Sequence, residues 1–74
     1  MTNEISAREL EVLKLFAKGL SRKEISERLI IGVKTVNTHL ERISEKLDIH
    51  SGVNLLRYLL LNGIFTVEDL KEKA

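Results

Sequence analysis

The side chains that could do chemistry in this chain gather between Ser21 and Lys46, and they offer hydrogen bonds and charge rather than a nucleophile or a metal site. Asn37 can bond adenine through both groups of its amide, and Thr38 offers a methyl group to thymine as well as a hydroxyl. Glu41 can accept a hydrogen bond from cytosine N4. We expect these three side chains to contact bases. The alternatives are a solvated helix surface for the first two and an ion pair with neighbouring cations for Glu41.

A second group of side chains in the same stretch is suited to phosphate. Ser21, Arg22 and Lys23 begin a predicted helix, where backbone N–H groups and the positive end of the helix dipole attract anions. Such contacts set register and salt dependence without reading sequence. A purely solvated role is the alternative for any one of them. The expected phosphate contacts are Ser21, Arg22, Lys23, Lys34, Thr35, Arg42 and Lys46.

Two helices joined by a short corner must position these groups. Ser21 and Glu24 form a capping box that opens a helix ending near Leu29, and the next helix starts after Gly32 and runs to about Leu47. Apolar residues on this later helix recur at spacings of three and four, which predicts one buried stripe of Val33, Val36, Leu40, Ile43 and Leu47. We predict a helix-turn-helix over about residues 21–41, with the chain's third helix in the major groove of DNA.

The rest of the chain predicts three more helices. Ser6 and Glu9 form another capping box, and the helix that they open runs through about Lys18 and stops at Gly19. Its predicted core-facing residues are Leu10, Val12, Leu13, Phe16 and Ala17. A fourth helix is predicted over roughly residues 52–62, and a short terminal helix is predicted near residues 66–69. The expected fold class is all-α: a single four-helix, bundle-like domain over residues 1–74, with a short C-terminal helix.

The predicted fourth helix is apolar on more than one side. One arc, expected to face the core, holds Val53, Leu55, Leu56, Leu59 and Leu60. The extra apolar residues either pack against the C-terminal segment or form a second face. We expect that second face to be a two-fold dimer contact made by Asn54, Arg57, Tyr58 and Leu61.

Composition excludes several classes of function. The 74 residues include no cysteine and two histidines, so disulfides and thiolate metal sites are excluded, which fits a cytoplasmic protein. No signal peptide or membrane span is visible. Neither a nucleophile constellation nor a Gly-rich phosphate loop occurs, and we expect no enzyme activity, cofactor, metal or bound small molecule. The formal net charge is only +1, but residues 21–47 hold six basic and four acidic side chains.

Several separate blocks of the chain resemble the LuxR/FixJ-type helix-turn-helix domain of bacterial transcription regulators. These blocks lie at residues 5–13, 19–26, 35–39 and 46–47, within a resemblance over about residues 5–56. The resemblance implies a third helix that reads DNA and a fourth that dimerises. It also implies a bacterial transcription regulator, either a small free-standing one or the output domain of a larger response regulator or ligand sensor. We expect sequence-specific binding of double-stranded DNA by a homodimer that regulates transcription, with RNA polymerase considered as a further partner. The chain departs from the family's usual residues at Gly32, Asn37, Glu41 and Gly52.

Those departures, together with the low net charge, leave two other interpretations open. The domain could be a helical protein-interaction module that kept the fold and lost DNA binding. It could also be a sigma-factor-like promoter-binding domain, which shares the helix-turn-helix. Binding to mixed-sequence duplex DNA, with a steep salt dependence, separates the DNA binders from the interaction module.

Overall fold

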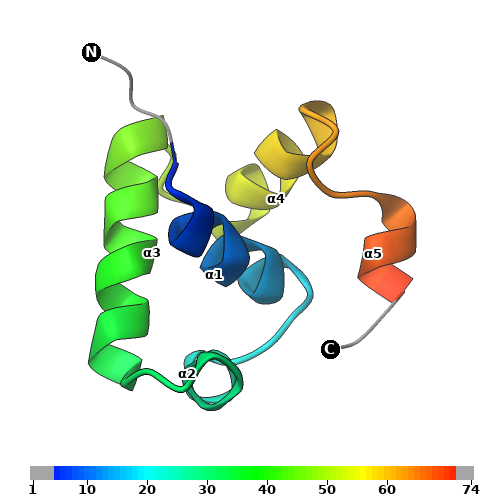
Figure 1. The fold of residues 1–74 in the computed structure, drawn as a ribbon. Coiled ribbons are helices and arrows are strands. Elements are labelled where there is room, and N and C mark those ends of the chain that lie inside the picture. Colours follow the sequence, from blue (N-terminus) through cyan, green and yellow to red (C-terminus); the bar gives the residue numbers. More distant parts are fainter. Residues whose placement is uncertain (1–4, 72–74) are drawn as a thin grey trace.

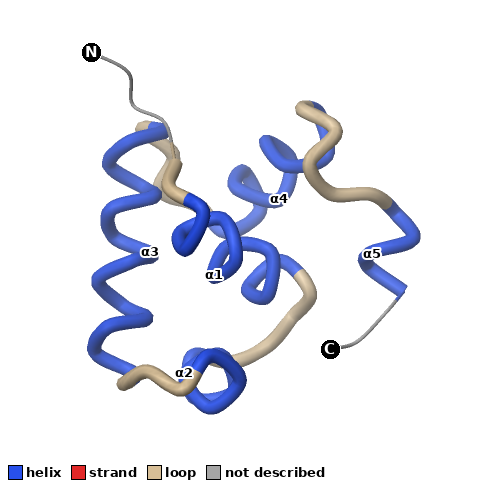
Figure 2. Tube along the Cα trace, in the orientation of Figure 1, coloured by secondary structure: helices blue, strands red, loops and turns tan. Residues whose placement is uncertain are grey.

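The computed structural model describes residues 5–71 and shows five helices. They are α1 (Ala7–Ala17), α2 (Arg22–Leu29), α3 (Val33–Leu47), α4 (Gly52–Leu61) and α5 (Val67–Lys71). Figure 2 shows short loops joining these helices, and the described residues contain no strand. The all-α prediction is confirmed, including the short C-terminal helix.

Two capping boxes start α1 and α2, as the sequence predicts. The hydroxyl of Ser6 accepts from the N–H of Glu9 at 3.1 Å, and the carboxylate of Glu9 accepts from the N–H of Ser6 at 2.9 Å. Ser21 and Glu24 repeat the arrangement, at 3.1 Å and 2.8 Å. The amino end of α3 differs, because its N-cap is Gly32 and no side chain caps it. These boxes satisfy N–H groups that have no acceptor within the helix.

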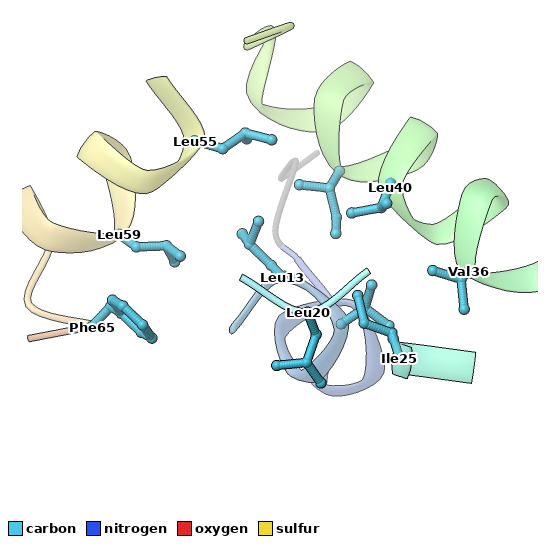
Figure 3. Close-up of a cluster of buried hydrophobic side chains, with 10 residues drawn as sticks. Leu13, Leu20, Ile25, Val36, Leu40, Leu55, Leu59 and Phe65 are labelled. Atoms are coloured by element: carbon cyan, nitrogen blue, oxygen red, sulfur yellow. The ribbon is translucent and has the colours of Figure 1, made fainter. Parts of the chain in front are cut away.

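The core forms around α1, which packs against α2, α3 and α4. In Figure 1, α3 and α5 lie on opposite sides of the domain with α1 between them. Figure 3 shows Leu13 of α1 between Leu59 of α4 and Val36 of α3. The buried apolar residues are Val12, Leu13, Leu20, Ile25, Val36, Leu40, Ile43, Leu55, Leu59 and Phe65. Their burial holds α3 in place from one side and leaves its other side to solvent.

Two residues that the sequence places in the core are exposed, and those predictions are wrong. Val33 is 42% exposed, because it is the first residue of α3 and a helix end has fewer neighbours than its middle. Val53 is 69% exposed, since the buried arc of α4 is narrower than predicted and centres on Leu55 and Leu59. Both valines therefore add apolar surface to the outside of the domain.

The corner between α2 and α3 depends on one left-handed residue. Ile30 ends α2 with φ 57° and ψ 51°, and the N–H of Ile31 then donates to the carbonyl of Ser26 at 3.0 Å. The carboxyl end of α3 repeats this geometry at Asp48, where φ is 54°. Such a bend stops a helix within one residue and redirects the chain. It fixes the direction in which α3 leaves the corner.

Candidate nucleic-acid interface

The outward side of α3 carries the side chains that the sequence assigns to DNA. Val36, Leu40 and Ile43 are buried on the opposite side of the helix. Asn37 and Thr38 remain partly exposed and are not enclosed by the domain's own packing. The other predicted contacts on this side are exposed: Lys34, Thr35, Glu41 and Arg42. The helix thus presents hydrogen-bonding groups along the surface that a major groove would meet.

Thr38 makes one local hydrogen bond that limits its role. Its hydroxyl donates to the carbonyl of Lys34 at 3.1 Å, one turn earlier in α3. The oxygen retains acceptor capacity, and the side chain also has its methyl group. Thr38 is therefore prepared to accept a hydrogen bond or to contact a methyl, rather than to donate.

An open groove of about 440 Å³ runs beside the middle of α3. It brings together Asn37 and Glu41 of α3, Arg22 at the start of α2, and His50 after α3, which are far apart in sequence. The remaining lining residues are Leu40, Ser44 and Glu45. The groove combines amide, carboxylate and guanidinium groups, so it can both donate and accept hydrogen bonds. Sequence reasoning did not assign Ser44, Glu45 or His50 to this surface. The helical spacing could have found Ser44 and Glu45, which follow Glu41 by three and four residues on α3, whereas His50 reaches the groove only through the turn after α3.

The amino end of α2 presents cations beside that groove. Arg22 and Lys23 are exposed, and the guanidinium of Arg22 lies 5.9 Å from the ring centroid of Phe16, within cation–π range. The side chain of Ser21 is used by the capping box, so its contribution to an anion is as the cap that orients this end of the helix. The first N–H groups of a helix have no intrahelical acceptor and point along its axis. These features make the end of α2 suitable for a phosphate.

Lys46, which is partly exposed, forms an ion pair with a buried carboxylate. Its ammonium donates to the carboxylate of Glu9 at 2.7 Å, and Glu9 is only 4% exposed. Burial alone would raise the pKa of Glu9, but the Lys46 ammonium and the N–H of Ser6 together lower that pKa below its ordinary value. The pair ties the last turn of α3 to the first turn of α1. We therefore leave Lys46 out of the phosphate contacts proposed below.

The predicted dimer residues of α4 divide into two groups. Asn54 and Arg57 are exposed, and Leu61 is 78% exposed. Tyr58 is partly buried and packs against the core, so only part of it can reach a partner. Val53 joins the exposed group, and Val53, Arg57 and Leu61 follow one another at intervals of four residues. The outward stripe of α4 is thus centred on these three residues.

Residues 5–71 were also searched for metal sites and for membrane-spanning helices. That part of the chain holds no group of three His, Cys, Asp or Glu side chains placed for a metal ion. None of its helices is long and apolar enough to cross a membrane. His39 lies half-buried on α3, and its Nδ1 is buried with no hydrogen-bond partner.

Comparison with known proteins identifies the family to which the chain belongs. Residues 3–59 match the family described as "Bacterial regulatory proteins, luxR family". The uncharacterized response regulatory protein YgeK of Escherichia coli K12 is 43% identical over 65 residues, which are 88% of this chain and 44% of that protein. The oxygen regulatory protein NreC of Staphylococcus carnosus is 48% identical over 56 residues, 76% of this chain and 26% of that protein.

The chain spans less than half the length of these relatives. No solved structure matches it. The matching family consists of DNA-binding transcription regulators and is not a class of enzymes. On its five-helix fold and on these matches, the chain belongs to the luxR family of bacterial regulatory proteins as a helix-turn-helix, DNA-binding domain.

Proposed function

We propose that α3 enters the major groove of double-stranded DNA and that Asn37, Thr38 and Glu41 contact base edges there. The observation that carries the proposal is that these three side chains remain partly or fully exposed on α3, outside the buried stripe of Val36, Leu40 and Ile43. An amide suits adenine, a threonine methyl suits thymine and a carboxylate suits cytosine N4. Three side chains with different base preferences therefore share the recognition of the DNA sequence.

Phosphate contacts flank the helix in this proposal. Arg22 and Lys23 supply charge at the start of α2, and the cap at Ser21 orients the N–H groups there. From α3 itself, Lys34, Thr35 and Arg42 reach the phosphates on the two sides of the groove. These contacts supply affinity and its salt dependence, while the base contacts supply specificity.

Two copies of the domain bind together through α4. Arg57 and Leu61 form the centre of this contact, with Asn54, Val53 and the exposed part of Tyr58 around them. A two-fold axis at α4 would place two copies of α3 on half-sites about one helical turn apart. The protein then acts in the cytoplasm, on promoter DNA, and RNA polymerase is its natural further partner.

Selection of bound duplexes from a random pool tests the base contacts. The wild type should select a motif with two related half-sites. Glu41→Gln should relax the preference at one base pair of each half-site, while the matched control Glu68→Gln on α5 leaves the motif unchanged. An unaltered motif for Asn37→Ala, Thr38→Ala and Glu41→Gln would overturn the assignment of base contacts.

A salt titration on mixed-sequence duplex DNA tests the phosphate contacts. Lys23→Ala should reduce the slope of log K against log salt by about one for each protein copy, because one fewer phosphate is neutralised. Lys71→Ala, on the opposite side of the domain from α3, is the control and should keep the slope. Absence of DNA binding at low salt would favour the interaction-module interpretation instead.

Sedimentation tests the α4 contact. Leu61→Asp should shift the protein toward monomer, because it places a charge in an apolar contact. The control Val67→Asp changes an exposed valine of α5 and should leave the association unaltered. If wild type and Leu61→Asp associate equally, both free and on a two-half-site duplex, α4 is not the interface.

A further inference from the structure

Ile30 occupies a backbone conformation that its side chain disfavours. Four described residues have positive φ: Gly19, Ile30, Asp48 and Gly63. Glycine has no Cβ to clash, and aspartate tolerates this region better than most residues. A β-branched side chain there is a genuine outlier, with a cost of order 1–2 kcal/mol. Ile30 is the one β-branched residue among the four.

The corners at Ile30 and Asp48 are otherwise alike. In each, the N–H of the following isoleucine bonds to the carbonyl of a serine five residues earlier, at 3.0 Å for Ile31 and 3.1 Å for Ile49. The bend therefore requires a left-handed residue but does not require isoleucine. Asp48 shows that a polar residue serves the same geometry.

Packing does not compensate for this cost. Ile30 is 89% exposed, the largest exposure among the large hydrophobic residues that the structure describes. Val33, three residues later and first in α3, is 42% exposed. Ile30, in the corner between α2 and α3, and Val33, the first residue of α3, are here called the apolar edge; they come just before the proposed base-reading residues in the sequence. Strain and exposure at one residue beside a functional surface point to a role in contact with a ligand.

We propose that this apolar edge contacts thymine 5-methyl groups in the major groove, so that Ile30 is a specificity-determining residue. The inference rests on the proposed function, because it assumes that the amino end of α3 lies against DNA. The thymine methyl is the apolar group that a major groove displays, and aliphatic side chains read it by contact. The half-site should then contain a thymine at the border that faces the α2–α3 corner, next to the bases read by Asn37 and Thr38.

The test replaces each thymine of the selected duplex, one at a time, with deoxyuridine, which lacks only the methyl group. At one position in each half-site the wild type should bind about fourfold more weakly, the value expected for one buried methyl-sized group. Ile30→Asn should bind the thymine duplex more weakly by a similar factor and show no further loss with deoxyuridine at that position. This non-additivity assigns the methyl contact to Ile30.

Folding of the variant is checked independently. Asparagine tolerates positive φ, so Ile30→Asn should unfold at the same temperature as the wild type or a higher one. The matched control is Val67→Asn on α5, an exposed valine that lies away from α3 and should keep the full response to deoxyuridine.

The outcomes separate this inference from the proposed function. If no duplex binds at low salt, both fail. If duplexes bind but lack a bordering thymine, or if Ile30→Asn retains the wild-type response to deoxyuridine, the DNA-binding proposal stands and the methyl contact is wrong. In that case Ile30 and Val33 are left as a surface for a protein partner. A strongly destabilised Ile30→Asn would also overturn the inference, since it would mean that Ile30 supports the fold.

Discussion

The two ends of α3 are built in opposite ways. At the carboxyl end, Lys46 donates to the buried Glu9 at 2.7 Å, and Asp48 occupies a left-handed position that suits it. At the amino end, Gly32 provides no side-chain cap, and Ile30 and Val33 expose apolar surface. One end is satisfied within the domain. The other end has no side-chain cap and leaves apolar groups exposed, so they are available to a ligand.

This difference shows how the domain can fix the position of α3 and still leave one end of the helix free to contact a ligand. The ion pair to α1 sets the position of α3 from its far end, with support from the buried Val36, Leu40 and Ile43. Changes at the carboxyl end should therefore alter stability, and changes at the amino end should alter recognition. The predictions below test that separation.

The largest expected effect is the loss of stability in Glu9→Ala. The substitution removes a capping carboxylate and leaves the Lys46 ammonium without its buried partner, so the free energy of unfolding should fall by about 2–4 kcal/mol. Ser6→Ala is the matched control, because it removes the cap hydroxyl from the same box, keeps the Glu9–Lys46 pair and should cost about 1 kcal/mol. Urea denaturation measures both. Equal losses would show that the Glu9–Lys46 pair adds nothing.

Asn37→Ala should leave the stability of the domain nearly unchanged and should weaken base recognition. Its unfolding free energy should change by less than about 0.5 kcal/mol, since Asn37 is partly exposed. Discrimination against the wrong base at one position of the half-site should fall by about 1–3 kcal/mol. Competition binding with single-base variants of the selected duplex measures this, and undiminished discrimination would contradict the proposed role.

Lowering the pH should destabilise the contact between the carboxyl end of α3 and α1. The folded-state pKa of Glu9 is lowered from its ordinary value of 4.5, so its carboxylate stabilises the fold above that pH and loses this effect as pH falls through the folded pKa. The wild type should therefore lose more stability than Glu9→Gln between about pH 6 and pH 3. Parallel pH dependences for the two proteins would contradict the assignment.

The smallest expected effect is a gain in stability at the amino end of α3. Gly32 has φ −74°, and a Cβ added there meets nothing within 4 Å, so serine fits without strain. Gly32→Ser should raise the unfolding free energy by a few tenths of a kcal/mol, because its hydroxyl caps α3. Gly32→Ala supplies the control, and an equal gain from alanine would show that capping is not the cause.

Much of this architecture follows from local sequence. The boxes at Ser6 and Ser21 and the spacing of Val36, Leu40 and Ile43 predict helix starts and the buried side of α3, because both depend on neighbours within one or two turns. The same spacing overextends the buried stripe to Val33, since periodicity does not show where covering helices end. The assignment of the bases read by α3 remains a prediction.

The buried pairing of Glu9 with Lys46 lies beyond such reasoning. The two residues are 37 positions apart, and their meeting depends on how α1 crosses α3. A capping box predicts a hydrogen bond for Glu9 but not its burial. The left-handed conformation of Ile30 could not be predicted from the sequence for a related reason. Its backbone angles are set by the corner between α2 and α3 and not by the preference of isoleucine.

Titration of the isotope-labelled protein with its selected duplex, followed through backbone amide NMR shifts, tests the separation of the two ends most directly. The account predicts the largest shift changes at residues 21–23 and 30–42, and small changes at residues 46–48 and in α5. Largest changes at the carboxyl end of α3 or in α5, with residues 30–38 unmoved, would contradict it.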